Sequence, residues 1–511
     1  MNNAGPQSLA HKIAIFIAKY RALIVLFLFI FVLRIPSLVE PHRYADEEIY
    51  LTLGQAVRKG LVLYRDIHDN KPPLLYLVAA VAGSLFWFRF ILLVFHTFGV
   101  IFFWKLAELL FDKNRVAVFI ATAVFGVFST LPTLEGNIAN GENFMIVPAI
   151  IGFFLFYRFL TVPSTNHRPL IPFSIGLSFA VSFLFKIPIL FDFFSLLLFW
   201  CFFVEPSFRV RVLVRRMLSL PFLAMVSGFV LPVLLSIAYY SWLGAFEPYV
   251  SAALLQNVGY VSSWRSGGEG VFTNPLIWRG AVVLGVTVFL FLFSSKLSMA
   301  VRFVSLWAVF SMYGALLSSR PYPHYLLEPL AAAVFLITLV YSERFFLVRL
   351  LAAMLFTLLL LAYIENRFWY YPTFPYYRNF IRYATGRIGW DGYLDSFGVR
   401  RNYLISSYIT QHTFASDRIF VWGTEPSIYA LSERLPVGRY AVSYHIFDFR
   451  AFDETIIAIQ ESPPPYIIVI EDLDRFTQLK SYLVKYYILE TTIEGASLYR
   501  RLPDTQAQVG H

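Results

Sequence analysis

Cysteine and charged residues are both scarce in this sequence of 511 residues. The one cysteine, Cys201, lies inside an apolar stretch, so no intramolecular disulfide can form and any exposed domain must be held together by its own core. Charged residues make up 14% of the chain and hydrophobic residues 58%, whereas roughly 25% of a soluble domain is charged. Polar side chains cannot cover that much apolar surface, which excludes an ordinary soluble fold and predicts a protein solvated by lipid.

Sequence motifs for metal ions and nucleotides are also missing. The chain has no HExxH motif, no cysteine pair and no histidine cluster, and it has neither a GxGxxG nor a Walker pattern. Asp66 and Asp69 lie in an expected exposed loop and are weak evidence for a cation site. We therefore expect no cofactor and no metal site, although assistance by a divalent ion stays open.

Positive charge exceeds negative charge, and the formal net charge is +10. Such an excess is also typical of nucleic-acid-binding proteins, in which basic residues gather on one soluble face. Here they lie in short clusters between apolar stretches, as in the cytoplasmic loops of membrane proteins. We therefore expect membrane lipids, and not nucleic acid, as partners.

Long apolar stretches recur through residues 1–364. A helix needs about 20 mostly apolar residues to cross a bilayer, and by this criterion the sequence predicts about eleven spans. The expected spans are 20–35, 74–105, 116–131, 144–160, 170–185, 187–204, 218–240, 278–293, 303–317, 325–341 and 345–364. The first lacks a small-residue cleavage pattern, so we expect a retained helix and not a signal peptide. The second is long, and its first part is expected at the membrane interface.

Alternate loops differ in their content of lysine and arginine. The richer set includes the N-terminal segment and the loop that contains Arg215 and Arg216, and this set is expected in the cytoplasm. An odd number of spans then places the C-terminal segment on the opposite side. We expect a multi-pass protein of a bacterial inner membrane, with a cytoplasmic N-terminus and an extracytoplasmic C-terminal domain.

The C-terminal segment, 365–511, is polar and has short apolar runs bounded by turns. The runs 418–423 and 463–470 predict buried strands, and 425–432 between them predicts a helix. Strand, helix and strand indicate a small α/β domain. The chain is thus expected to be a polytopic α-helical membrane protein with a small extracytoplasmic α/β domain.

The first outer loop, 36–73, has structure of its own. Ile49, Leu53 and Val57 are four residues apart, which predicts an amphipathic helix that ends near Gly60 and lies along the membrane surface. Asp46, Glu47 and Glu48 begin this helix. Acidic residues stabilise the positive end of the helix dipole, but a carboxylate at the membrane surface could also act as a general base.

Further polar clusters lie at the same expected face. Lys71 precedes Pro72-Pro73 where the chain re-enters lipid; it could only snorkel, or it could bind a phosphate together with Arg65 and His68. Glu135, Asn137, Asn140 and Glu142 form a turn that is either simply solvated or in contact with sugar hydroxyls. Arg320 and His324, held by two prolines, are a candidate anion site.

The first-loop pattern resembles a known family. It comprises Asp46-Glu47, Tyr50, Gly54, Gly60, Leu63-Tyr64-Arg65-Asp66 and Lys71-Pro72-Pro73-Leu74. This pattern is similar to that of GT-C glycosyltransferases of the dolichyl-phosphate-mannose–protein mannosyltransferase type. The branch it resembles most is the bacterial family-39-like enzymes, which include aminoarabinose transferases acting on lipid A and galacturonosyl transferases acting on the lipopolysaccharide core.

The resemblance implies a polyprenyl-phosphate-linked sugar as donor and an extracytoplasmic lipid, glycan or protein as acceptor. Asp46 matches the family's catalytic aspartate, and Lys71 matches a lysine that contacts the donor phosphate. Arg320, His324 and Arg65 are expected to bind the same phosphate. The remaining expected substrate contacts are Glu47, Tyr64, Glu135, Asn140, Glu142 and Tyr325. One base without a covalent partner implies a single displacement with inversion.

Two other classes of protein fit the composition. A transporter or flippase of lipid-linked sugars would carry ionisable groups near the bilayer midplane, often on broken helices of paired repeats. In this sequence such groups gather at one face, and no repeat is evident. The third hypothesis is a non-catalytic assembly partner whose outer domain binds a carrier protein or a polysaccharide.

Overall fold

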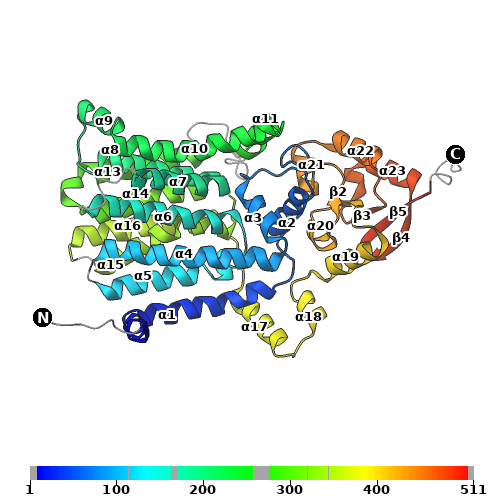
Figure 1. The fold of residues 1–511 in the computed structure, drawn as a ribbon, viewed down its shortest axis with the longest axis horizontal. Coiled ribbons are helices and arrows are strands. Elements are labelled where there is room, and N and C mark those ends of the chain that lie inside the picture. Colours follow the sequence, from blue (N-terminus) through cyan, green and yellow to red (C-terminus); the bar gives the residue numbers. More distant parts are fainter. Residues whose placement is uncertain are drawn as a thin grey trace.

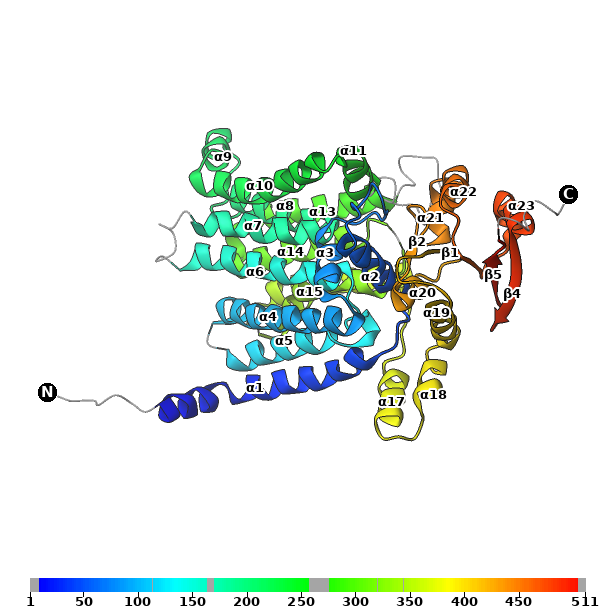
Figure 2. The same ribbon diagram turned by 45° about the vertical axis from the view of Figure 1, so that its right-hand side comes forward.

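The computed structural model describes residues 9–112, 114–162, 170–256, 275–318, 320–342 and 344–503. Residues 257–274, in the loop expected between spans seven and eight, therefore lie outside the described residues. Figure 1 shows long helices running side by side, with a smaller domain that contains the sheet at one end and the N-terminus at the other. Figure 2 shows the same separation after a turn of 45°.

Seven described helices are long and apolar enough to cross a membrane. These spans are Tyr20–Val39 of α1 (Leu9–Val39), α4 (Leu85–Phe111), α6 (Gly141–Thr161), α10 (Leu220–Trp242), α13 (Pro275–Leu292), Pro323–Ser342 with α15 (Leu327–Ser342), and α16 (Phe346–Asn366). Four shorter apolar helices accompany them: α5 (Arg115–Phe128), α7 (Leu170–Phe185), α8 (Leu190–Phe202) and α14 (Met299–Ala315). The polytopic helical fold is confirmed, while the number eleven stays a prediction.

The expected second span, 74–105, is divided into two helices. α3 (Leu74–Ala82) ends at Gly83, whose φ of +74° is a left-handed conformation that a glycine adopts without strain. α4 begins after Ser84, which is extended. The single long span was therefore wrong in its first part, because a glycine that ends one helix stands directly before a serine that precedes the next.

Aromatic side chains fill the interior of the bundle. The Phe103 ring of α4 stacks on Phe125 of α5 with centroids 4.2 Å apart, and on Phe335 of α15 with centroids 4.3 Å apart. Stacked pairs of this kind add to the free energy gained by burial alone. They fix three helices that carry site residues at one of their ends or in the adjoining turns.

The first loop forms α2 (Ala45–Arg58), as the sequence predicted, and Gly60 follows its end with φ +86°. Its residues from Glu47 to Ala56 are all buried, because α2 lies between α3 and α20 (Ser427–Ser432) of the C-terminal domain (Figure 2). Protein therefore covers the apolar face of α2 that lipid was expected to cover, while its place at the membrane surface stays a prediction.

Two helices connect the bundle with the sheet, α17 (Thr373–Ala384) and α18 (Trp390–Asp395). The Tyr377 hydroxyl donates a hydrogen bond to the Leu33 carbonyl of α1 at 3.0 Å, and the Tyr376 hydroxyl donates to Glu40 at 3.0 Å. These bonds fasten the start of the C-terminal segment to the end of the first span.

The C-terminal domain contains one five-stranded sheet with strand order β2-β1-β3-β5-β4. Its strands are β1 (Arg418–Trp422), β2 (Leu435–Pro436), β3 (Tyr466–Val469), β4 (Tyr487–Ile493) and β5 (Ala496–Arg501). β1 is parallel to β2 and β3, with Phe420 opposite Ile467, while β5 is antiparallel to both β3 and β4. The predicted strands and helix correspond to β1, β3 and α20, which confirms a small α/β domain.

Helices cover both faces of this sheet. Alternate residues of β1 point to opposite sides, so Ile419 and Val421 pack with α19 (Arg400–His412) and α20. Phe420 and Trp422 pack with the other helices: α21 (Ser443–Asp448), α22 (Phe452–Glu461) and α23 (Thr477–Tyr486). Strands β1 and β3 are thereby buried on both sides, whereas most of β4 is exposed. Helices α20 and α21 of the domain also contact the first loop.

Candidate functional site

Asp46 and Lys71 meet, although the whole of α2 separates them in sequence. Asp46 lies in the first turn of α2, and its side chain is 32% exposed. The Lys71 ammonium lies 3.8 Å from Asp46 Oδ2 and 5.0 Å from the centre of the Tyr50 ring. The chain folds back because Tyr64, at φ +71°, reverses it, and the Tyr64 hydroxyl donates to the Lys71 carbonyl at 2.8 Å.

A second carboxylate, Asp69, stands on the other side of the lysine. Its Oδ2 atom lies 3.7 Å from the Lys71 ammonium and accepts a hydrogen bond from the Tyr76 hydroxyl at 2.8 Å. Burial alone would raise the pKa of Asp69, but the adjacent Lys71 ammonium holds it below its usual value. Lys71 is therefore held between one buried, fixed carboxylate and one partly exposed carboxylate.

Tyr50 connects the two ends of this arrangement. Its hydroxyl donates to Asp46 Oδ2 at 3.1 Å. Burial, and then the negative charges of Asp46 and Asp69, raise the pKa of the Tyr50 phenol well above its usual value. Because the phenol keeps its proton, it serves as a permanent hydrogen-bond donor to Asp46.

A second polar cluster lies beside the first, at the start of α6, the end of α7 and the turn that leads into α15. The Tyr44 hydroxyl donates to Glu135 at 3.2 Å and lies 3.3 Å from His324 Nδ1. His324 contacts Glu135 through Nδ1, and its Nε2 lies 3.5 Å from Glu142. The ammonium of Lys186, directly after α7, is paired with Glu142. Burial and the charges of Glu135 and Asp46 raise the pKa of Tyr44, so the two clusters are electrostatically connected.

His324 differs from its expected role. Both ring nitrogens face carboxylates, Glu135 on one side and Glu142 on the other. Neither nitrogen is therefore open to a phosphate oxygen in this structure. The expectation that His324 binds the donor phosphate directly is not supported by this arrangement, which instead makes it the bridge between two acidic residues.

Glu47 was expected to contact substrate, but in the structure it forms a buried ion pair instead. It is fully buried, and its two oxygens accept from Arg89 Nε at 2.8 Å and from Arg89 Nη2 at 2.5 Å. The backbone N–H of Ala139 donates to the same carboxylate at 2.6 Å. With both oxygens occupied, Glu47 fastens α2 to α4 and has no atom left for a substrate.

Tyr64 and Arg65 also lie away from their expected roles. The Tyr64 side chain is fully buried, with its ring 5.2 Å from that of Tyr240, and its hydroxyl closes the loop. The Arg65 guanidinium contacts its neighbour Asp66 at 2.7 Å and 3.0 Å and the carbonyl of Leu243 at 2.9 Å. A packed tyrosine and a guanidinium with these acceptors hold the loop in place.

The other expected residues surround the second cluster. Asn140 caps α6, because its Oδ1 accepts from the Asn143 backbone N–H at 3.2 Å. The Tyr325 ring lies beneath the Lys186 ammonium, 4.5 Å from its centre. Arg320 is partly buried, four residues before His324. Their contacts with a substrate stay predictions.

Several residues of the site were not predicted as such. Asp69 was considered only as a weak cation ligand, and Tyr44, Arg89 and His445 were not singled out. Their neighbours come from distant segments, so periodicity gives no sign of them. The spacing of Asp69 and Lys71, two residues apart in a loop turned by two prolines, was the one available signal for the Asp69–Lys71 pair.

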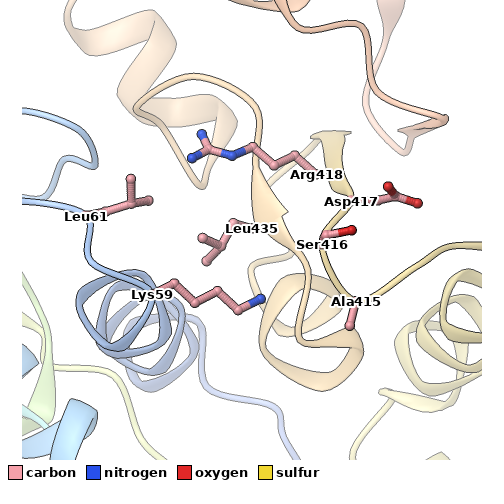
Figure 3. A pocket seen from close by; sticks show the side chains of 7 residues that line it. All are labelled: Lys59, Leu61, Ala415, Ser416, Asp417, Arg418 and Leu435. Carbon is pink, nitrogen blue, oxygen red and sulfur yellow. The ribbon is translucent and has the colours of Figure 1, made fainter.

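No group of three histidine, cysteine or carboxylate residues able to hold a metal ion occurs in the part of the chain that the structure describes. A cavity of about 250 Å³ lies at the opposite end of α2, between Lys59 and Arg418. Figure 3 shows these two side chains on either side of Leu435. At about 1.5 Å per helical residue, the cavity is roughly 20 Å from Asp46 and is separate from the site.

No family model and no curated protein matches this chain. Among solved structures it is similar to ArnT from Cupriavidus metallidurans bound to undecaprenyl phosphate, at 12% identity and a TM-score of 0.55, covering 95% of this chain and 99% of that one. The apo state of ArnT matches at 11% identity and a TM-score of 0.53, covering 95% and 98%. An Archaeoglobus fulgidus oligosaccharyltransferase tethered with an acceptor peptide matches at 13% identity and a TM-score of 0.44, covering 96% and 75%.

The agreement with ArnT extends over nearly the whole length of both proteins. It confirms the GT-C glycosyltransferase fold that the first-loop pattern predicted, including the C-terminal domain. At this level of identity the likeness concerns the fold, so the activity has to be argued from the residues of this chain.

Proposed function

We propose that the protein is a membrane glycosyltransferase that transfers a sugar from a polyprenyl-phosphate-linked donor to an extracytoplasmic acceptor, with inversion. The observation that carries this proposal is the meeting of Asp46 and Lys71, 3.8 Å apart, beside the outer ends of the spanning helices. A base and a phosphate-binding cation are the two groups that such a transfer needs. The acceptor is a lipid, a glycan or a protein.

Lys71 is the donor-phosphate ligand in this proposal. The released polyprenyl phosphate is a monoester with a second pKa of about 6, so it leaves without a general acid. What it needs is a positive charge beside the departing oxygen. Lys71 supplies this charge, and Arg320 is expected to add a second one.

Asp46 is the proposed base. Its carboxylate is paired with Lys71, so an arriving phosphate competes with Asp46 for the ammonium. That competition releases Asp46 to accept the proton of the acceptor hydroxyl, which then attacks the sugar carbon from the face opposite the phosphate. Lys71 thereby keeps the base occupied until the donor is present.

The positions of four ionisable residues favour a glycosyltransferase over a transporter. Glu142 is the second residue of α6, Glu328 the second of α15 and Asp192 the third of α8, while Lys186 directly follows α7. All four lie at helix ends, whereas transporters hold such groups near the midplane. We place this end of the bundle outside the cytoplasm of a bacterial inner membrane, with the N-terminus inside.

Asp46→Asn tests the proposal. The variant keeps the shape of the side chain but cannot accept the proton, so transfer from a polyprenyl-phosphate sugar in proteoliposomes should fall by about 10²–10⁴-fold. Binding of the donor should be retained. Asp474→Asn, at an exposed aspartate of the C-terminal domain that pairs with Lys480, is the control and should transfer normally. Full transfer by the Asp46 variant would contradict its role as base.

A further inference from the structure

The C-terminal domain extends to the lysine of the proposed site through α21. His445 on that helix is buried, and its Nε2 atom lies 3.6 Å from Asp69 Oδ1. Asp69 lies 3.7 Å from the Lys71 ammonium, and Lys71 lies 3.8 Å from Asp46. Four side chains thus follow one another from the domain to the proposed base.

Near His445, several residues of the first loop contact the C-terminal domain. The backbone N–H of His68 donates to the Arg439 carbonyl at 2.8 Å, and Arg439 Nη2 donates to the Tyr64 carbonyl at 2.8 Å. The His68 ring packs against Phe449, with centroids 4.8 Å apart, and against His445 at 5.6 Å. The loop segment from Tyr64 to Lys71 therefore packs against the C-terminal domain. A shift of the segment would require a shift of the domain.

We propose that His445 is a positioning residue for the transfer reaction: its ring lies against the Asp69 carboxylate and limits how that carboxylate can turn, and Asp69 in turn holds the Lys71 ammonium at the place where the donor phosphate binds. This inference rests on the proposed function, in which Lys71 is the phosphate ligand. It assigns a part of the reaction to the C-terminal domain.

The physical reason is the flexibility of lysine. Its four-carbon stem has several rotatable bonds, so one carboxylate alone would not keep the ammonium in place. Asp69 and Asp46 attract it from two sides at nearly equal distances. When a phosphate displaces Asp46, Asp69 stays, because the Tyr76 hydroxyl and the Asn70 backbone N–H each donate to it at 2.8 Å.

His445 suits this role because it adds no charge. Burial lowers the pKa of its ring, as does the nearby Lys71, although the carboxylates of Asp69, Asp448 and Asp46 oppose that effect. The neighbouring His68 ring packs edge to face against it, and burial lowers the pKa of that ring as well. A cationic ring here would compete with Lys71 for Asp69.

A double-mutant cycle on the full-length protein in detergent micelles tests the inference, with undecaprenyl phosphate as the ligand. His445→Leu should raise its Kd about tenfold, which corresponds to about 1.4 kcal/mol. Lys71→Met should raise it at least as much. Adding His445→Leu to Lys71→Met should then change nothing further, because the first residue acts through the second.

Three comparisons complete the experiment. His445→Gln, which keeps an amide near the position of Nε2, should restore most of the affinity, and His412→Leu on the exposed side of α19 should bind as the parent does. An unchanged Kd for His445→Leu, or additive losses in the double variant, would overturn the positioning role while leaving the proposed function standing. An unchanged Kd for Lys71→Met would overturn the proposed phosphate ligand itself.

Discussion

Two adjacent carboxylates, Asp46 and Glu47, have opposite environments. Successive residues of a helix point about 100° apart, so Asp46 faces Lys71 while Glu47 faces Arg89. The first is partly exposed and has a single weak ion pair, whereas the second is buried with every oxygen bonded. One residue is available for chemistry, and its neighbour holds the helix that positions it.

The Glu47–Arg89 pair should therefore matter for stability. Arg89→Met removes the guanidinium between Glu47 and Glu40, which lies 3.3 Å away on its other side. Breaking a buried ion pair on one side costs about 3–5 kcal/mol, because a charge is left without a partner. We expect a clearly lower midpoint of thermal unfolding in detergent micelles.

Asp474→Asn is the matched control for this variant. Asp474 pairs with Lys480, but both side chains are more than half exposed, and exposed pairs contribute little. Its midpoint should stay at that of the parent protein. If Arg89→Met behaved in the same way, the buried pair would not be what fastens α2 to α4.

At this scale the sequence predicted some roles and not others. Asp46 and Lys71 were recognised because they belong to a known pattern and have chemistry that the reaction needs. Glu47 and Tyr64 belong to the same pattern but serve packing, and sequence alone gave no reason to separate them. The distinction depends on Arg89 and Tyr240, whose positions only the fold defines.

α2 and α3 pack unusually closely, and a glycine permits it. A Cβ atom on Gly54 would lie 2.7 Å from the backbone nitrogen of Ala80 and 2.8 Å from the carbonyl carbon of Ala79. Backbone atoms cannot turn aside as a flexible side chain can. This contact explains Gly54, a glycine of the first-loop pattern, in physical terms.

Gly54→Ala should therefore move α2 away from α3. We expect a loss of about 1–3 kcal/mol in stability from overpacking, together with a higher KM for the donor, because Asp46 and Lys71 would no longer be aligned. Thermal unfolding and transfer kinetics measure the two effects.

Gly285→Ala in α13 provides the comparison, since nothing lies within 4 Å of the Cβ that it would add. Alanine also favours a helix over glycine, so this variant should be as stable as the parent or slightly more so. Equal behaviour of the two variants would mean that α2 and α3 can separate freely.

Elements were largely predictable because they depend on local properties. Apolar length indicated the spans, and spacing indicated α2 and the strands β1 and β3. Gly83 is a sequence signal for the break between α3 and α4. The apolar residues around it nevertheless led to the prediction of one continuous span. The packing of the C-terminal domain on α2 was not predictable, since an amphipathic helix suits a lipid surface and a protein surface equally well.

The whole molecule consists of a membrane module and a domain joined across the first loop. His68 is buried in that joint, and burial, with the adjacent His445, lowers its pKa to about 3. An unfolded histidine has a pKa of about 6.5. Below that pH the unfolded chain takes up a proton that the folded protein does not, so stability decreases as the pH falls from 6.5 toward 3.

Acidification from pH 7 to pH 5 should accordingly lower the free energy of unfolding, by about 2 kcal/mol for this residue alone. His68→Leu removes the titrating ring but keeps an apolar contact with Phe449, so its unfolding midpoint should depend less on pH over this range. His412→Leu should keep the pH dependence of the parent. A slope for His68→Leu equal to that of the parent would exclude His68 as the source.

The joint between the two parts was beyond prediction from sequence. The two-part organisation follows from composition, which changes near residue 365. The contacts between the parts join segments that share no pattern, such as Thr52 with Pro426 and His68 with Arg439. Only complementary shape and hydrogen bonding define them.

One consequence of this joint concerns the order in which its two sides are synthesised. Gln55 on α2 donates to the Ala430 carbonyl of α20, a partner 375 residues later in the chain. At a synthesis rate of about 5–20 residues per second, α20 is synthesised roughly 20 to 75 seconds after α2. A prematurely ended chain would lack the partner of Gln55, so under the proposed function we expect the first loop to be correctly packed only in completed molecules.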